Sequence, residues 1–244
     1  MRRLHWLNEQ DPDSFPDVRQ ALEEPNGLLA VGGDLSAERL EQAYLRGIFP
    51  WYSEGQPVLW WSPDPRMVLF PERLRVTRSL RKRAQNAGFR VTFDQAFEHT
   101  ITACAAPRPG QPGTWISDDV IAAYTQLHRK GVAHSVEVWD GDELAGGLYG
   151  VGLGKAFFGE SMFSRQRDAS KIALLWLTRQ LSAWDYALID CQVSSTHLFS
   201  LGAEEVSRDE FIARLKVAVA EPGQPSPWQF DPGFSPLPQP TEEA

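Results

Sequence analysis

Two polar residues near the C-terminal third of the chain have the types and spacing needed to position a reacting group. In LIDCQ, residues 188–192, Asp190 and Gln192 are two positions apart. On a β-strand this spacing points both side chains to one face and Cys191 to the other, so that a carboxylate can hydrogen-bond an amide. The alternative is a buried Asp190 that is satisfied by neighbouring backbone groups and has only a structural role.

A second candidate is the carboxylate of Glu160. In FFGESMFS, residues 157–164, Glu160 lies among aromatic residues. A buried carboxylate costs free energy unless it is paired. Glu160 is therefore a candidate for binding an amine, either from a lysine or arginine of the protein or from a ligand.

Two segments are candidates for binding anions. SRQRDASK places Arg165, Arg167 and Lys171 around a predicted helix start, where free backbone N–H groups also favour negative charge. RLRVTRSLRKR, residues 73–83, is dense in basic residues and contains no acid. It could contact phosphates or could simply be the solvated face of a helix.

The loop from residue 47 to 66 is rich in both tryptophan and proline. GIFPWYSEGQPVLWWSPDPR, residues 47–66, contains three tryptophans and four prolines. Each proline removes a backbone donor and fixes a torsion, so regular structure is predicted to be short here. Ser36 is a predicted N-cap and Gly47 ends the helix between them, which anchors the loop.

Several kinds of chemistry have no support in the sequence. No nucleotide-binding glycine motif, GxSxG or HExxH is present, and the cysteines Cys104 and Cys191 have no ligand spacing. We therefore expect no metal and no cofactor. His134 and His197 are single histidines, which are more often packing residues than catalysts.

Composition is that of a globular protein. The chain has 244 residues, 42% of them hydrophobic, and a net charge of −8, which argues against indiscriminate nucleic-acid binding. No apolar run reaches the length of a membrane helix or of a signal core, so we expect a cytoplasmic protein that contacts no membrane.

Patterning along the chain predicts an α+β fold. After the aromatic loop come a short strand at 67–70, a basic helix capped by Thr77 and a strand at 89–93. Helices are predicted from about 94 to 106 and after Ser117, followed by a three-strand meander from 134 to 163. An apolar helix (168–185), a buried strand (187–193), a short helix and a last helix capped by Ser207 complete the expected elements. We expect a small N-terminal domain (1–62), a larger domain (63–220) and a proline-rich, partly disordered tail (221–244).

Six ordered blocks go beyond such patterns. The sequence resembles the bacterial leucyl/phenylalanyl-tRNA–protein transferases over about residues 15–215 through EPNGLLAVGGDLS (24–36), RGIFPWYSEGQPVLWWSPDPR (46–66), GTWIS (113–117), HSVEVW (134–139), GESMFSRQRDASK (159–171) and LIDCQV (188–193). The resemblance implies an enzyme that moves leucine or phenylalanine, with methionine also accepted, from aminoacyl-tRNA to proteins with N-terminal Arg or Lys. Such products enter N-degron degradation. It also implies a larger domain similar to the GCN5-related N-acetyltransferase fold and a reaction that needs neither metal nor ATP.

The same resemblance implies roles for individual residues. Asp190 and Gln192 match the catalytic pair of the family, in which Asp190 orients the Gln192 amide and the amide oxygen accepts from the attacking α-amine. Trp51 and Trp115 match aromatic positions near the terminal adenosine of tRNA, and Glu160 matches a position beside the aminoacyl group. The implied lining of the aminoacyl pocket is Leu148, Phe157, Gly159, Leu174, Leu177 and Leu181.

The expected phosphate contacts come from the basic segments: Arg78, Arg81, Lys82, Arg83, Arg165 and Lys171. We expect a monomer. Two rival functions stay open: an N-acyltransferase that uses acyl-coenzyme A, which lacks the expected glycine-rich pyrophosphate loop, and a non-catalytic tRNA-binding protein on the same fold.

Overall fold

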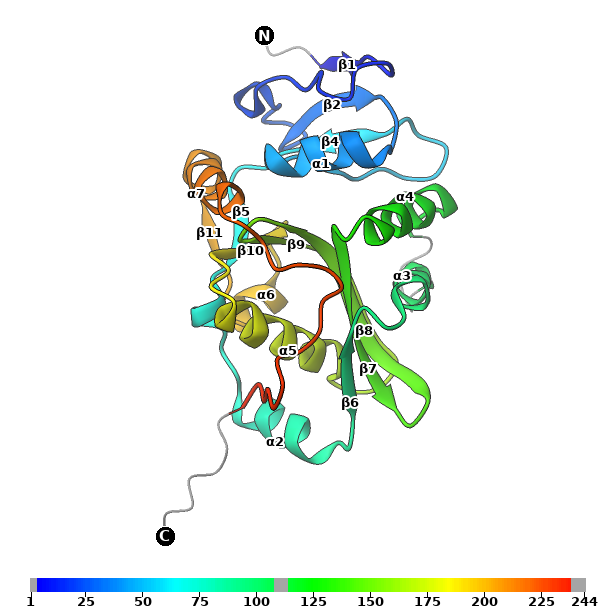
Figure 1. The fold of residues 1–244 in the computed structure, drawn as a ribbon. Coiled ribbons are helices and arrows are strands. Elements are labelled where there is room, and N and C mark those ends of the chain that lie inside the picture. Colours follow the sequence, from blue (N-terminus) through cyan, green and yellow to red (C-terminus); the bar gives the residue numbers. More distant parts are fainter. Residues whose placement is uncertain (1–3, 108–113, 238–244) are drawn as a thin grey trace.

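The structure, a computed structural model, describes residues 4–107 and 114–237 and contains two mixed sheets (Figure 1). The smaller sheet has the order β1-β2-β4-β3, in which β1 pairs parallel to β2 and the other pairs are antiparallel. Its elements are β1 (His5–Leu7), β2 (Leu28–Gly32), α1 (Ala37–Leu45), β3 (Phe49–Pro50) and β4 (Leu59–Trp61).

The larger sheet has seven strands in the order β11-β5-β10-β9-β8-β7-β6. Within this sheet, β9 and β10 are the only strands that pair in parallel among the described residues. The strands are β5 (Arg66–Leu69), β6 (Arg90–Phe93), β7 (Ala133–Asp140), β8 (Glu143–Leu153), β9 (Ala156–Ser164), β10 (Leu188–Gln192) and β11 (Glu204–Val206).

Helices cover both faces of this sheet (Figure 1). The apolar helix α5 (Ala169–Ala183) packs on one face and α3 (Phe97–Ala105) with α4 (Asp118–Arg129) on the other, which creates two hydrophobic cores. The remaining helices are α2 (Arg78–Asn86), α6 (Thr196–Ser200) and α7 (Arg208–Ala220). No helix in the described ranges is long and apolar enough to span a membrane.

Most predicted elements are present, and the differences have local causes. Predicted N-caps at Ser36, Thr77, Ser117 and Ser207 each accept a hydrogen bond from the backbone of the following helix. The helix predicted from about residue 94 begins instead at Phe97 as α3, because Asp94 has a left-handed φ of 54°. The strands of the smaller sheet and β11 were not predicted, since they are only two to five residues long.

The C-terminal segment from residue 221, for which the sequence predicts a partly disordered tail, is described as far as residue 237. Residues 221–237 run back along the larger sheet and bury Trp228 to 1% exposure (Figure 1). Burial of an aromatic side chain offsets the proline-rich composition that predicted disorder. Residues 238–244, the end of that predicted tail, lie outside the described residues.

Candidate functional site

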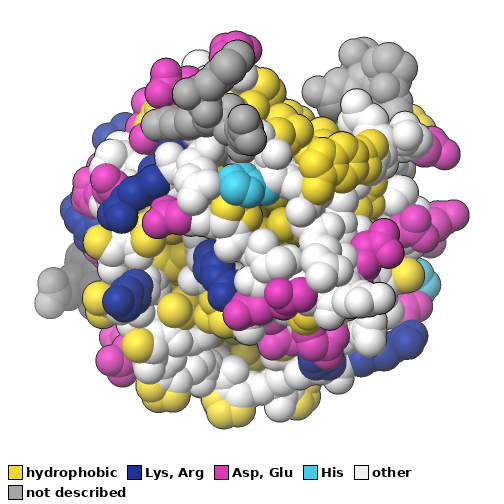
Figure 2. Space-filling view, turned by 90° about the horizontal axis from the view of Figure 1, so that it is seen from above, with side chains coloured by type: hydrophobic (Ala, Val, Ile, Leu, Met, Phe, Trp, Pro, Cys, Tyr) yellow, Lys and Arg dark blue, Asp and Glu magenta, His cyan; other side chains and the backbone are white. Residues whose placement is uncertain are grey.

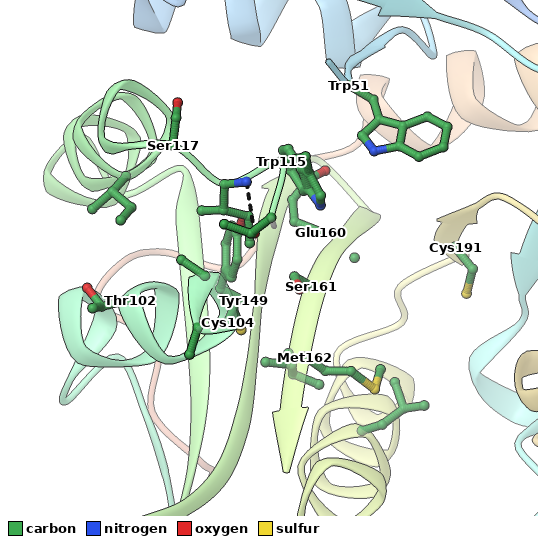
Figure 3. Close-up of a pocket in the computed structure, with 18 of the residues that line it drawn as sticks. Trp51, Thr102, Cys104, Trp115, Ser117, Tyr149, Glu160, Ser161, Met162 and Cys191 are labelled. Carbon is green, nitrogen blue, oxygen red and sulfur yellow. Dashed lines mark hydrogen bonds between the residues drawn. The ribbon is translucent and has the colours of Figure 1, made fainter. Parts of the chain in front are cut away.

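A cavity of about 1230 Å³ opens between the smaller sheet and the larger sheet with its helices. Its walls come from the β3–β4 loop, α3, the start of α4, strands β8–β10 and α5 (Figure 3). Strand pairing explains the opening: β9 and β10 are paired only as far as Phe158 and Asp190, whereas β9 continues to Ser164. Beyond that point the parallel strands separate, which leaves room for a ligand.

Glu160 lies at the centre of a hydrogen-bond network beside this cavity. A β-bulge in the β8–β9 pairing lies between Gly159 and Ser161 and aims Glu160 at three donors from distant elements. Its carboxylate accepts from the Tyr44 hydroxyl of α1 (2.7 Å), the Tyr124 hydroxyl of α4 (3.1 Å) and Nε2 of Gln192 (2.7 Å). The two tyrosine hydroxyls also contact each other. Among the described residues its hydrogen-bond donors are these three neutral groups and not a lysine or arginine, so an amine bound by Glu160 would come from a ligand.

This environment changes the acidity of Glu160. Burial raises the pKa of its carboxyl from 4.5 to about 7, although the two tyrosine hydroxyls and the Gln192 amide favour the charged form. The same burial raises the pKa values of the Tyr44 and Tyr124 hydroxyls well above 10, so both remain protonated donors. A group that titrates near neutral pH inside a cavity is a candidate for function.

Asp190 has partners that the sequence did not reveal. Its carboxylate forms a two-pronged, fully buried salt bridge with Arg66 (2.8 and 2.6 Å), whose guanidinium lies between the Phe49 and Phe211 rings. Asp190 also accepts from the backbone N–H of Gln192 at 2.9 Å. Its contact to Gln192 is therefore through the backbone, whereas Glu160 binds the Gln192 side-chain amide.

The expectation that Asp190 orients the Gln192 amide directly, from the same face of a regular strand, is corrected by this geometry. The β10–β5 register shifts between Asp190 and Gln192, and Gln192 has a left-handed φ of 64°. The bulge interrupts the two-residue alternation. Ile189 and Cys191 of the same strand line the cavity.

The apolar lining agrees largely with the predicted set. Leu148, Phe157, Gly159, Leu174 and Leu177 line the cavity. Leu181, one helical turn beyond Leu177 and two residues before the end of α5, is fully buried and is not among the lining residues. Unpredicted apolar or sulfur-containing lining residues include Cys104, Met162, Ile189, Cys191 and Leu198.

The tryptophans divide into cavity and core residues. Trp51 is 46% exposed and lines the cavity with Trp115, which lies just before α4 (Figure 3). Trp61 donates from its indole to the Trp51 carbonyl oxygen (2.6 Å) and its ring lies 5.8 Å from that of Trp51. Trp60 is fully buried and donates to the Gly32 carbonyl. Of the two adjacent tryptophans, Trp60 is thus a core residue.

The predicted phosphate-binding residues are spread over two regions. Arg78, Arg81 and Lys82 are exposed on α2, which lies at the far end of the molecule from α1 (Figure 1), whereas Arg83 is half-buried over the Phe89 ring at 5.2 Å. Acidic and basic side chains are interspersed on the opposite face (Figure 2).

The other two predicted cations lie near α5. Arg165 is exposed, with its guanidinium 5.6 Å from the Phe163 ring. Lys171 pairs with Asp168 at 3.1 Å.

Three site residues were missed by the sequence analysis. Tyr44, Tyr124 and Arg66 are fully buried, and their polar atoms serve the site. A signal existed for Tyr44, which is on the apolar face of a well-marked helix and whose hydroxyl needs a partner when buried. Among the described residues, no cluster of His, Cys, Asp or Glu could hold a metal ion.

Comparisons with known proteins give matches along the chain. A family profile described as leucyl/phenylalanyl-tRNA protein transferase matches residues 68–216, and one described as the N-terminal domain of that protein matches residues 33–64. The protein of this name from Alkalilimnicola ehrlichii is 57% identical over 97% of this chain and 93% of its own length. That from Cellvibrio japonicus is 58% identical over 94% and 98%. Among solved structures, L-PGS from Bacillus licheniformis covers 69% of this chain at 10% identity, with a TM-score of 0.39 and 56% of its own length covered.

Proposed function

Because the chain belongs to the leucyl/phenylalanyl-tRNA–protein transferase family, we propose that it transfers leucine or phenylalanine, and also methionine, from aminoacyl-tRNA to proteins whose N-terminal residue is Arg or Lys. The observation that carries the proposal is a single cavity that combines an apolar wall with the Glu160 network and two tryptophans. The products are substrates for N-degron degradation. Aminoacyl-tRNA is made in the cytoplasm, where we also place this protein.

The reaction is an aminolysis of an ester. The acceptor α-amine attacks the aminoacyl carbonyl carbon, a C–N bond forms, and the bond from that carbon to the ribose oxygen of the terminal adenosine breaks. One proton leaves the amine and one is gained by the departing ribose oxygen. The ester is already activated, so the residues need only align the reactants and manage the proton.

Gln192 is proposed to align the attacking amine. An ionised Glu160 can only accept hydrogen bonds, so the Gln192 amide must turn its Nε2 toward it at 2.7 Å. The amide oxygen is then available to accept from the acceptor amine. Glu160 also offers a carboxylate for the aminoacyl α-amine or a ribose hydroxyl, and Asp190 supports Gln192 through its backbone.

The rest of the cavity supports donor binding. Leu148, Phe157, Leu174 and Leu177 are proposed to surround the leucine or phenylalanine side chain. The two tryptophans, Trp51 and Trp115, are proposed to stack on the terminal adenine, and each stacking contact is worth about 1–3 kcal/mol. An indole held by a proline-containing loop loses little entropy on binding.

We also propose a fold class for the larger sheet with its helices and a boundary between two domains. A meander (β7–β9), a helix (α5) and a strand that returns parallel to β9 support a GCN5-related N-acetyltransferase-like core. We propose a domain boundary between β4, which ends at Trp61, and β5, which begins at Arg66. The rival acyl-coenzyme A activity remains without a glycine-rich loop to bind its pyrophosphate.

The proposal is tested by transfer of labelled leucine and phenylalanine from charged tRNA to a peptide that begins with Arg. We expect transfer without added ATP, and none to the matched peptide that begins with acetyl-Arg, because acetylation removes the nucleophile. Binding of charged tRNA without transfer would instead support a non-catalytic tRNA-binding protein. Transfer from acyl-coenzyme A would support the other rival.

The basic residues of α2 give a separate prediction about tRNA. Replacing Arg81, Lys82 and Arg83 together with Ala should weaken tRNA binding and reduce the slope of log affinity against log salt by about 2 to 3, because each phosphate contact releases counterions. The measurement is tRNA affinity across a salt series. Replacing Arg129 and Lys130 with Ala, which removes two cations at the end of α4, is the control. An unchanged slope in the triple variant would count against this surface.

A further inference from the structure

The C-terminal segment fixes one tryptophan within an aromatic cluster in the hydrophobic core that contains α5. Trp228 stacks on His134, with ring centroids 3.7 Å apart and planes 4° apart. Its backbone N–H donates to Asp94 and its indole N–H to the Gln224 carbonyl, both at 3.1 Å. Trp184 also packs edge-on against it, at 5.4 Å. The indole therefore has one defined position.

This tryptophan contacts a residue of the cavity wall. The Phe157 ring lies 5.9 Å from the Trp228 ring and is 1% exposed, yet Phe157 lines the cavity. On β8, a side chain at Gly150 would place its Cβ 2.6 Å from the Phe157 ring. The ring thus fills the space that Gly150 leaves open, and Trp228 packs against it.

We propose, on the basis of the transfer activity proposed above, that Trp228 is a positioning residue for selection of the aminoacyl side chain. Its indole holds the Phe157 ring in place and so sets the size of the apolar part of the cavity. Protein interiors are close-packed, so a smaller residue at position 228 leaves space into which Phe157 can move. The cavity then enlarges and accommodates phenylalanine better relative to leucine.

The test compares two donors on one protein sample. In the full-length chain, Trp228→Phe should raise the ratio of kcat/KM for phenylalanyl-tRNA to that for leucyl-tRNA by about threefold to tenfold. Because incomplete folding lowers both rates equally, the ratio remains informative for a destabilised variant. Trp228→Tyr, with intermediate volume, provides a second and smaller expected shift in the same direction.

Two further variants separate packing at Phe157 from general destabilisation. Phe157→Leu removes the wall residue itself and should change the ratio. Phe230→Leu alters the same C-terminal segment, but its ring packs on Phe93, Trp176 and Phe234, so the ratio should stay at the wild-type value.

The possible outcomes discriminate the proposals. A changed ratio in Phe157→Leu with an unchanged ratio in both Trp228 variants overturns the role of Trp228. An equal change in Phe230→Leu also overturns it, because the effect would then be a general one. If the wild-type protein transfers from neither donor, the proposed function fails, and that result is distinct from a failure of this inference.

Discussion

The Glu160→Gln variant should lose about 100-fold in kcat/KM for transfer while keeping its fold, because small misplacements of a positioning group have effects of that size. Ionised Glu160 accepts from Tyr44, Tyr124 and the Gln192 amide nitrogen. A glutamine at 160 can either donate or accept, so the Gln192 amide is no longer forced to turn its oxygen toward the substrate. The measurement is peptide transfer at pH 8 with saturating charged tRNA.

The pH dependence provides a sharper version of this experiment. The pKa of Glu160 is raised to about 7, so the carboxylate is ionised above that pH and protonated below it. The acceptor α-amine, with an ordinary pKa of about 7.7–8.0, must also lose a proton to attack. Below both values, log kcat/KM for the wild type should rise with a slope of two per pH unit, and for Glu160→Gln with a slope of one.

The tyrosine hydroxyls that face Glu160 supply no competing titration in this range. Tyr44 from α1 and Tyr124 from α4 have raised pKa values, as does Tyr149 from β8, while Asp190 from β10 is paired with Arg66. The matched control is Glu54→Gln, which removes another carboxylate from the same cavity wall and should keep the slope of two. A slope of two in Glu160→Gln would contradict the proposed role.

The free energy of unfolding should fall with rising pH over the range in which the activity rises. Because the folded-state pKa of Glu160 lies above its ordinary value, its protonation stabilises the fold fully below pH 4.5, and this contribution is lost as the pH rises through about 7. The Glu160→Gln variant avoids that loss. The difference in melting temperature, Glu160→Gln minus wild type, should therefore be larger at pH 8 than at pH 5.

The sequence identified residues of the site, but it could not identify their partners. Glu160 was visible as a carboxylate among aromatic residues, whereas its donors Tyr44 and Tyr124 lie 116 and 36 positions away. Asp190 was visible in an apolar strand, but Arg66 lies 124 positions away. Periodicity reports which face a side chain occupies, and it contains no information on pairs so distant in the chain.

Local irregularities account for the other differences. The two bulges, at Glu160 and after Asp190, each interrupt a regular alternation that predicted the side-chain directions. The capping serines and the closing glycines were predictable, since those signals act within one helical turn. Trp228 lies in a proline-rich segment whose composition predicts partial disorder. The composition of a segment does not show whether a single aromatic side chain within it is buried and anchors it.

The buried pair of Arg66 and Asp190 allows a test of whether Asp190 holds the backbone or carries a proton. Arg66→Met alone leaves a fully buried carboxylate without its partner and should lower the free energy of unfolding by about 3–5 kcal/mol. In the double variant Arg66→Met/Asp190→Asn no charge remains unpaired, so most of that stability should return. Chemical denaturation of both variants measures the difference.

Activity of the double variant then distinguishes the two roles. Asparagine at 190 keeps an oxygen that can accept from the Gln192 N–H, which Asp190 accepts at 2.9 Å, but it cannot take up a proton. If Asp190 acts by holding the Gln192 backbone in its left-handed conformation, kcat/KM should stay within about tenfold of the wild type, well short of the 10²–10⁴-fold that an acid–base group contributes. Arg39→Met, which removes a buried arginine of α1, controls for destabilisation. A loss of about a thousandfold in a folded double variant would instead make the Asp190 carboxylate part of the proton's path, since geometry alone would have been preserved.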